Sequence, residues 1–243
     1  MLQVLALDSA TNVASCAVVN PAKILVEFNL NTTKTHSERL LPLISQALEY
    51  ADLSLEQMDG FSISIGPGSF TGLRIGLATI KALAYFTGKP LVGISTLDGL
   101  AANLQNLDGL ICPVLRARRD EVYCALYLNA SSGQERISDY MAISPEKLIG
   151  VLSQFAGSKI NFLGDGITML PDNLEDLLGI DCGNAHELYS MPRAATIGFL
   201  GLKRLEKGLY DDLDSLTPMY IKASAAEDRL REKKLACEGG GNG

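Results

Sequence analysis

Apolar and polar residues alternate in short blocks at the start of the chain, and these blocks predict an antiparallel meander. The apolar runs are Gln3–Leu7, Ala14–Val19 and Lys23–Leu30. Polar turn residues separate them, at Asp8–Thr11 and at Asn20-Pro21. Such runs between turn signals are typical of neighbouring strands.

Leucines at helical spacing follow, and they predict a helix over His36–Tyr50. We expect Ser37 to cap it and Pro42 to end its first turn or kink it. The next elements are a strand over Phe61–Ile65, a helix over Phe70–Thr87 ended by Gly88 and Pro90, and a strand over Leu91–Ile94.

The second half repeats this order. It predicts strands over Ile111–Leu115, Glu121–Leu128, Glu135–Ile143 and Lys159–Leu163. A helix starts at Ser144-Pro145, with Ser144 as its cap, and another covers Ala194–Leu205.

A β-β-β-α-β-α unit that occurs twice predicts an α/β fold of the actin-like, ribonuclease-H-like (ASKHA) class, with two lobes around a cleft. We expect an N-terminal lobe at 1–103 and a smaller lobe at 104–193. A closing helix and return segment at 194–227 and a mobile tail at 228–243 complete the expected division.

The charge balance limits the possible partners. Of the 243 residues, 21 are basic and 28 acidic, so the formal net charge is -7. An acidic chain is a poor binder of nucleic acid by itself, so a role on RNA would need a basic partner. The five cysteines form no CxxC pair, which favours free thiols in a reducing cytoplasm over a zinc site. We expect neither a signal peptide nor a membrane span.

Two turns at the expected cleft suggest a nucleotide contact. The first carries Asp8, Ser9 and Thr11, and the second contains Gly66 and Gly68 and opens a helix, as in phosphate sites. The second turn matches neither a Walker motif nor GxGxxG. Asp8 and Ser9 could instead bond the local backbone, and Ser69 or Thr71 could simply cap the helix.

The helix over Phe70–Thr87 is apolar nearly all round, which predicts burial on two sides. Gly72 and Gly76 lie four residues apart within it, and each costs about 1 kcal/mol of helix stability relative to alanine. Close approach of another helix would offset that cost. Burial within one fold and burial against a second subunit both fit the pattern.

The remaining polar residues offer no catalytic constellation. The two histidines, His36 and His186, are 150 positions apart and are expected to be exposed and ordinary. There is no GxSxG motif and no cysteine near a plausible histidine partner. The basic cluster Arg116, Arg118 and Arg119 is either a solvated turn or a contact to a partner or tRNA.

Several motifs resemble the TsaB (YeaZ) family, the dimerisation subunit of the bacterial machinery that makes N6-threonylcarbamoyladenosine (t6A) in tRNA. They are LALDSAT at Leu5–Thr11, HSERLLPLI at His36–Ile44, GPGSFTGLRIG at Gly66–Gly76 and GISTLDGLA at Gly93–Ala101. Weaker matches follow at Arg116–Tyr127 and Pro218–Lys222. The third motif is the most specific.

The resemblance implies a non-catalytic scaffold that pairs with the catalytic paralogue TsaD and with the ATPase TsaE. The complex would modify adenosine 37 of tRNAs that read ANN codons, and tRNA would be contacted only through the complex. TsaD carries two metal-binding histidines at the positions matched here by Thr96 and Leu100, so this lobe would lack that metal. No cofactor is expected to bind tightly, although ATP or ADP could bind at a subunit interface.

The resemblance also favours an interface formed by the first two helices, either with TsaD or with a second copy. Its expected residues are His36, Leu40, Leu41, Ile44, Leu48, Phe70, Gly72, Leu73, Gly76, Leu77, Ile80 and Leu83. We expect Gly76→Glu to abolish pairing and leave the monomer folded. The alternatives are an ATP-dependent small-molecule kinase of the same superfamily and, ranked last, a peptidase.

Overall fold

The computed structural model describes residues 1–32, 35–118, 120–130, 133–155 and 157–221. The first sheet has the strand order β3-β2-β1-β4-β5. Its strands are β1 (Val4–Asp8), β2 (Val13–Asn20), β3 (Lys23–Asn31), β4 (Gly60–Gly66) and β5 (Leu91–Ser95). β1 is antiparallel to β2 and parallel to β4, so the predicted meander and the two later strands are confirmed.

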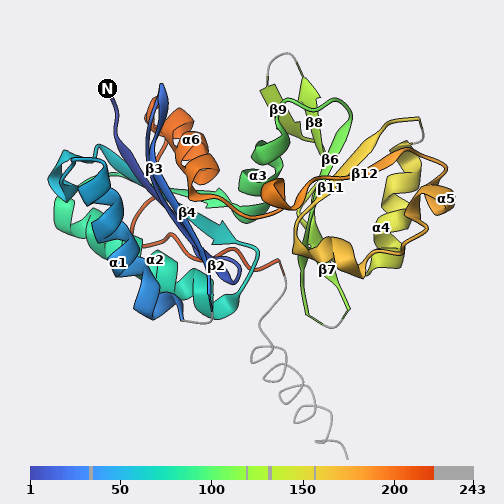
Figure 1. Ribbon diagram of the computed structural model, residues 1–243, viewed down its shortest axis with the longest axis horizontal. Coiled ribbons are helices and arrows are strands. Elements are labelled where there is room, and N and C mark those ends of the chain that lie inside the picture. The colour runs from blue at the N-terminus through green and yellow to red at the C-terminus, as the bar shows by residue number, and fades with distance from the viewer. Residues whose placement is uncertain (33–34, 119, 131–132, 156, 222–243) are drawn as a thin grey trace, which may run out of the picture.

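Helices cover both faces of this sheet (Figure 1). Leu5 and Leu7 of β1 pack with the helices α1 (His36–Tyr50) and α2 (Phe70–Thr87). Val4 and Ala6 point to the opposite face because side chains alternate along a strand, and they pack with α6 (Ala194–Leu205). The first lobe is therefore a three-layer unit whose last layer comes from the far end of the chain.

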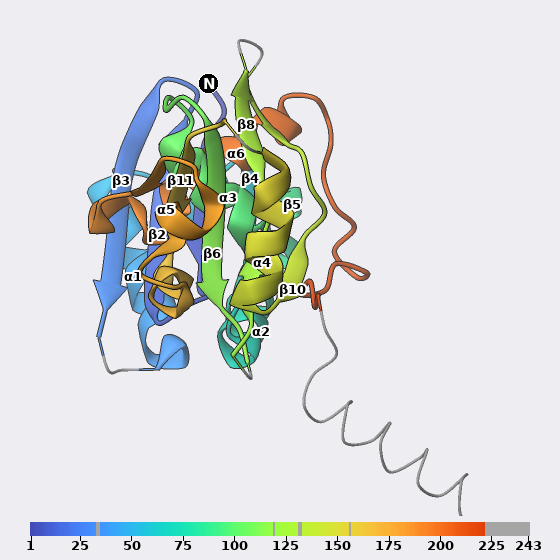
Figure 2. The ribbon, with the colours of Figure 1, turned by 90° about the vertical axis from the view of Figure 1, so that its right-hand side faces the viewer.

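The second sheet repeats the same order as β10-β7-β6-β11-β12, with β8 and β9 as a branch from β6. Its strands are β6 (Leu110–Arg116), β7 (Val122–Cys124), β8 (Tyr127–Ala130), β9 (Gly133–Arg136), β10 (Met141–Ile143), β11 (Ile160–Leu163) and β12 (Cys182–Asn184). Helices α4 (Pro145–Leu152) and α5 (Leu174–Leu178) pack on one face, and α3 (Thr96–Ala101) packs on the other. Figure 2 views the molecule from the side of this lobe. The predicted duplication is confirmed.

Each lobe thus sends the helix after its fifth strand to the junction with the other lobe, α3 from the first and α6 from the second. Short 3₁₀ helices occupy Leu55–Gln57, Ala102–Leu104, Ser153–Phe155, Asp165–Met169 and Glu187–Tyr189. No helix in the described part of the chain has the length and apolar character that a membrane crossing needs.

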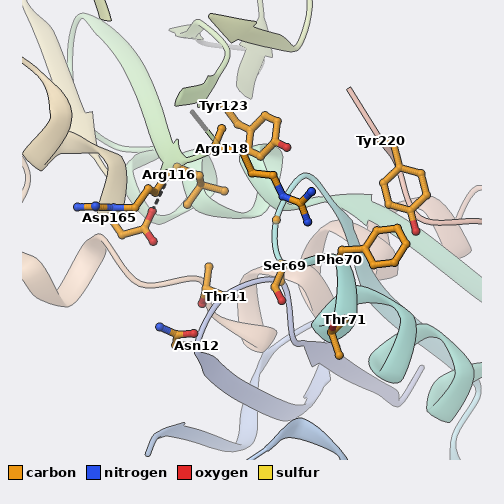
Figure 3. A pocket seen from close by; sticks show the side chains of 14 residues that line it. Thr11, Asn12, Ser69, Phe70, Thr71, Arg116, Arg118, Tyr123, Asp165 and Tyr220 are labelled. Carbon is orange, nitrogen blue, oxygen red and sulfur yellow. Dashed lines mark hydrogen bonds between the residues drawn. The ribbon is translucent and has the colours of Figure 1, made fainter. Parts of the chain in front are cut away.

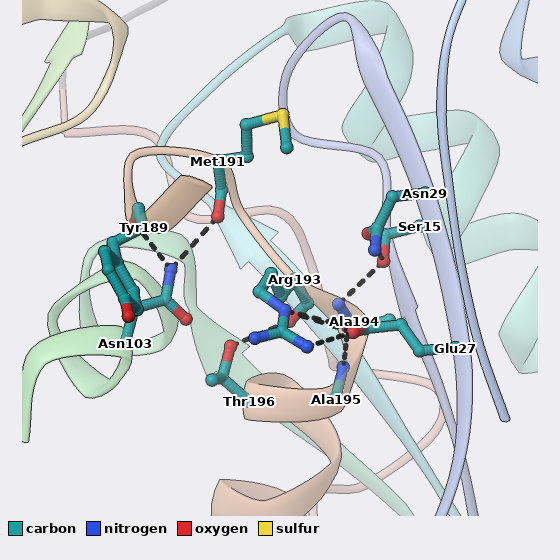
Figure 4. Close-up of polar contacts among 10 residues, drawn as sticks. All are labelled: Ser15, Glu27, Asn29, Asn103, Tyr189, Met191, Arg193, Ala194, Ala195 and Thr196. Carbon is teal, nitrogen blue, oxygen red and sulfur yellow. Dashed lines mark hydrogen bonds and ion pairs between the residues drawn. The ribbon is translucent and has the colours of Figure 1, made fainter. Parts of the chain in front are cut away.

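The start of α6 is held on the first sheet by polar contacts (Figure 4). Arg193 forms an ion pair with Glu27 of β3, and the Ala195 N–H donates to the same carboxylate at 3.0 Å. The Ala194 N–H donates to Ser15 Oγ of β2 at 2.8 Å. These contacts satisfy backbone donors that a helix start leaves without an intrahelical partner.

Two predicted strands of the second half are wrong in their extent. The runs expected at Glu121–Leu128 and Glu135–Ile143 are each divided into two strands, which pair in two separate places. At the division the Leu126 carbonyl still accepts from the Ile137 N–H at 2.8 Å, but the Leu126 N–H donates to Ser138 Oγ at 2.8 Å, so a side chain replaces one backbone partner. The periodicity of apolar residues does not reveal that one strand divides into two with different partners.

The cap predicted for α1 is wrong, and Pro42 does not end the first turn of the helix, while the alternative that Pro42 kinks it stays a prediction. The N-cap of α1 is Thr35, not Ser37, and the Thr35 N–H donates to the Glu38 carboxylate at 2.9 Å. The helix runs through Pro42 to Tyr50. Pro42 is on the exposed side of α1, where water can satisfy the backbone carbonyl that loses its helical partner.

The chain returns to the first lobe after α6. The Asp211 N–H donates to the Leu91 carbonyl at 2.9 Å, and the Met219 N–H donates to the Ile65 carbonyl at 2.7 Å. The tail predicted at 228–243 lies outside the described residues.

Candidate functional site

Most side chains expected at an interface on α1 and α2 point into the first lobe's own core. Leu40, Ile44, Leu73, Leu77 and Ile80 are at most 6% exposed and pack within this lobe. His36, Leu48, Phe70 and Leu83 are partly buried. Of the expected apolar set, Leu41 is the exposed member, at 58%.

The reason expected for the two helix glycines is corrected by the structure. A Cβ at Gly72 would lie 2.1 Å from the Ser9 carbonyl oxygen, and one at Gly76 would lie 2.1 Å from Ser9 Oγ. The Ser9 hydroxyl donates to the Gly72 carbonyl at 2.9 Å. The two glycines therefore allow the β1–β2 turn of the same chain to pack closely against α2, and it is this turn, not a second subunit, that they contact. Gly76→Glu would have to displace Ser9, so this variant would not test pairing separately from folding.

The outer faces of the two helices carry a different set of residues. α2 exposes Thr71, Arg74, Ala78, Ala82, Tyr85 and Phe86, which recur at helical spacing. Tyr85 is 83% exposed and Phe86 75%, and Leu41 lies on the exposed side of the neighbouring α1. The sequence masks this stripe because α2 is apolar nearly all round, with Tyr85 and Phe86 outside as well as Leu73, Leu77 and Ile80 inside. The spacing of these exposed residues from Gly72 and Gly76 could have shown in the sequence that they lie on the opposite face of the helix.

The start of the β1–β2 turn is buried beneath α2. Asp8 is 1% exposed, and its Oδ1 accepts a hydrogen bond from the Ala10 N–H at 2.9 Å. Burial raises the pKa of this carboxyl to about 6, and the Ala10 hydrogen bond offsets part of that shift. Asp8 thus bonds the local backbone, whereas Ser9 bonds α2.

The turn before α2 supplies the helix cap. Ser69 is the N-cap, and its Oγ accepts from the Gly72 N–H at 3.2 Å. The Ser69 N–H donates to the Ala10 carbonyl at 2.6 Å, and a Cβ at Gly68 would lie 2.2 Å from that same oxygen. The glycine-rich turn is therefore shaped in part by its contact with the β1–β2 turn.

A cavity of about 420 Å³ opens between the lobes at this point (Figure 3). Thr11 and Gly68 line it, whereas Asp8, Ser9 and Gly66, which were also expected to contact nucleotide, do not. The Arg118 guanidinium extends into the cavity toward Ser69 and Phe70.

The other residues around this cavity fix its two sides. The Arg116 N–H donates to Asp165 Oδ1 at 2.9 Å, and its guanidinium donates to Thr168 at 2.8 Å. Tyr220 from the return segment lies against Phe70, with ring centroids 5.4 Å apart. Arg116 is thus held by its own lobe, while Arg118 faces the cavity. Arg119 lies outside the described residues.

The two positions matched to metal ligands of TsaD serve the core here. Thr96 Oγ1 lies 2.7 Å from Ser64 Oγ, and both side chains are fully buried. Leu100 is fully buried where α3 packs on the second sheet. Within the described residues, no group of three or more His, Cys, Asp or Glu side chains could hold a metal ion.

The histidines and cysteines differ in their surroundings. His36 Nε2 lies 2.8 Å from the Thr11 carbonyl oxygen, and partial burial lowers the pKa of this imidazole. The expectation that His36 is exposed is therefore wrong, while His186 is exposed as expected. Cys16, Cys112 and Cys124 are buried free thiols.

Comparisons with known proteins identify the family. The family model of TsaD, tRNA N6-adenosine threonylcarbamoyltransferase, matches residues 24–229. The chain is 34% identical to the tRNA threonylcarbamoyladenosine biosynthesis protein TsaB of Haemophilus influenzae, over 94% of this chain and 97% of that protein. It is 29% identical to TsaB of Bacillus subtilis, over 96% and 100%.

A solved structure supports the fold. YeaZ from Pseudomonas aeruginosa superposes with a TM-score of 0.77 at 22% identity, over 91% of this chain and 100% of that one. Its likeness, with the duplicated strand order, gives an actin-like α/β fold. The chain therefore belongs to the TsaB (YeaZ) family of tRNA threonylcarbamoyladenosine biosynthesis proteins.

Proposed function

We propose that this chain is a non-catalytic subunit that pairs with a TsaD-type subunit through the outer faces of α1 and α2. The observation that carries the proposal is the exposure of Leu41, Tyr85 and Phe86 on two adjacent long helices. Large exposed apolar side chains on neighbouring helices are typical of interaction surfaces. The same face could join two copies of the chain, so a homodimer is the alternative assembly.

The proposed lack of catalysis rests on what fills the positions of the TsaD metal ligands. Thr96 and Leu100 are fully buried and occupied with contacts inside the fold. The partner would then supply the metal and the transfer chemistry. A TsaE-type ATPase would join the same complex. The net charge of -7 favours tRNA contact through the partners.

The test is light scattering after size exclusion, with the chain alone and mixed with the TsaD-type protein. Leu41→Glu and Ala78→Glu each place a charge on the outer face and should abolish the mixed complex. Leu177→Glu is the matched control, because Leu177 is a 52% exposed leucine on α5 of the second lobe. A mixed complex that survives the first two changes, or is lost with Leu177→Glu, would contradict the proposal.

A second proposal concerns ATP or ADP, and the cavity between the lobes supports it. The exposed start of α2 and the Arg118 guanidinium both face this space, and helix starts and arginines favour phosphate. We expect millimolar ATP to bind and Arg118→Glu to weaken that binding, as measured by calorimetry. Turnover of Mg-ATP by the purified chain would instead support the kinase alternative.

A further inference from the structure

A second, larger cavity lies at the other edge of the junction between the lobes. It has a volume of about 640 Å³ and is bounded by α3, the β8–β9 hairpin and the C-terminal half of α6. In Figures 1 and 2 the hairpin lies at the top of the molecule and α2 lies at the bottom. The cavity shares no lining residue with the cleft that faces Arg118, so the two are separate.

Its floor is a carboxylate held by two tyrosines. Asp98 Oδ1 accepts a hydrogen bond from the Tyr127 hydroxyl at 2.7 Å. The Tyr140 hydroxyl donates to both carboxylate oxygens, at 2.9 and 2.8 Å. Burial, followed by the nearby Asp98 charge, raises the pKa of Tyr140 to about 12, so this hydroxyl keeps its proton at neutral pH. The two donors disperse the Asp98 charge and reduce its repulsion toward an anion.

Three cations surround this floor. The Arg136 guanidinium lies over the Tyr140 ring, 4.1 Å from its centroid, which fixes the guanidinium plane. Arg204 donates to the Gly93 carbonyl at 2.9 Å and pairs with Asp211 at 3.2 Å, so its charge is largely committed. Lys203 is exposed on α6 and also lines the cavity.

The charges leave a small local excess of positive charge in an acidic protein. Three cations face two carboxylates, Asp98 and Asp211, which leaves one positive charge, whereas the whole chain carries -7. The guanidinium fork matches a carboxylate in shape. One excess charge matches a monoanion better than a phosphate dianion.

Apolar side chains complete the wall. Ile94 of β5 and Leu200 of α6 line the cavity beside the cations. Pockets for small molecules combine such apolar surface with a few placed polar groups. A ligand with an apolar body and one anionic end would therefore use both parts of the lining.

We propose that this cavity binds a small organic carboxylate between Lys203 of α6 and Arg136 of β9. α6 packs on the first sheet and β9 belongs to the second, so the ligand would bridge the two lobes. This site is independent of the α1–α2 face and of the cleft.

The test uses the full chain, with benzoate as the probe and benzamide as its neutral match of equal shape. In proton–nitrogen NMR we expect benzoate, at about millimolar concentration, to shift amide signals near Asp98, Arg136 and Lys203. Benzamide should shift them much less. Lys203→Glu should weaken benzoate binding about tenfold, and Arg136→Glu should act in the same direction. Lys207→Glu is an exposed control outside the cavity lining and should leave binding unchanged.

Equal shifts with benzoate and benzamide would overturn the proposal. The absence of shifts near these residues at about 20 mM benzoate would also overturn it, because the dissociation constant would then be too high for a specific site. Tighter binding of inorganic phosphate than of benzoate would overturn the ligand class. Unchanged binding after Lys203→Glu, in a variant whose spectrum shows a folded protein, would overturn the location.

Discussion

The two lobes share one strand order but differ in the helices that cover them. α1 and α2 of the first lobe have 15 and 18 residues, whereas the corresponding α4 and α5 have 8 and 5. Both pairs bury one face on their own sheet. The longer pair exposes several large apolar side chains, among them Leu41, Tyr85 and Phe86, whereas the shorter pair exposes one, Leu177. This difference is the reason for proposing that the first lobe's helices, and not their shorter counterparts, contact a partner.

The turns after the fourth strand of each lobe make a second comparison. A Cβ at Gly68 would lie 2.2 Å from the Ala10 carbonyl, and one at Gly164 would lie 2.3 Å from the Val114 carbonyl. In both lobes a glycine permits this turn to approach the backbone near the end of the first strand, at Ala10 just after β1 and at Val114 within β6. The first turn opens α2, while the second opens only the 3₁₀ helix Asp165–Met169. Glycine at this turn is thus a requirement of the lobe's packing, whatever the cleft binds.

The largest expected effect comes from Gly72→Ala in α2. Its new Cβ would lie 2.1 Å from the Ser9 carbonyl oxygen, so the β1–β2 turn must move. We expect the free energy of unfolding to fall by about 3 kcal/mol, measured by urea denaturation. Gly150→Ala in α4 is the control, since nothing lies within 4 Å of its added Cβ. It should raise stability by about 0.5–1 kcal/mol through helix propensity. Equal changes in the free energy of unfolding for Gly72→Ala and Gly150→Ala would contradict the claim that Gly72 is required by the contact with Ser9.

The next effect is the pH dependence due to Asp8. Its pKa of about 6 in the fold exceeds the ordinary 3.8, so between these values the folded chain keeps a proton that the unfolded chain loses. Stability from this group is complete below about pH 4 and is lost as the pH rises through 6.

Asp8→Asn should therefore stabilise the protein by about 2–3 kcal/mol at pH 7.5 and change it little at pH 4. The measurement is urea denaturation at both pH values. Asp172→Asn, at an exposed position of the second lobe, controls for removal of one acidic side chain. A difference between the Asp8 variant and the parent that is constant with pH would refute this account of Asp8.

A smaller effect is expected where the lobes meet. Asp98→Asn weakens the charge-assisted hydrogen bonds from Tyr127 and Tyr140, which connect α3 to the second lobe. We expect a loss of about 2 kcal/mol in the free energy of unfolding. Tyr127→Phe, which removes one of the two donors, should cost less. An unchanged free energy of unfolding in Asp98→Asn would mean that this contact does not stabilise the junction between the lobes.

The smallest effect on stability is expected for charges on the outer helix faces. Leu41→Glu in α1 and Leu177→Glu in α5 both change exposed leucines, at 58% and 52%. Each should alter the free energy of unfolding by no more than about 0.5 kcal/mol in urea denaturation. A large loss with Leu41→Glu would mean that the residue belongs to the core and would remove it from the proposed interface.

The sequence predicted the order of strands and helices well because each first-lobe element has its own apolar period. It failed at Ala125–Leu126, where Ser138 replaces a ladder partner, since such a contact has no local pattern. Its expected interface included inward residues such as Leu73 and Ile80, because apolar periodicity marks burial of any kind. Asp98 was missed because its tyrosine partners lie 29 and 42 positions away.

The central claim is that the first lobe's helices, and not their shorter counterparts, bind the TsaD-type subunit. Hydrogen–deuterium exchange of this chain, with and without that subunit, tests it most directly. We predict slower exchange in peptides covering His36–Tyr50 and Phe70–Thr87, with no change in Pro145–Leu152 or Leu174–Leu178. Protection confined to the second lobe's helices, or an unchanged first lobe in a mixture that forms a complex, would contradict the claim.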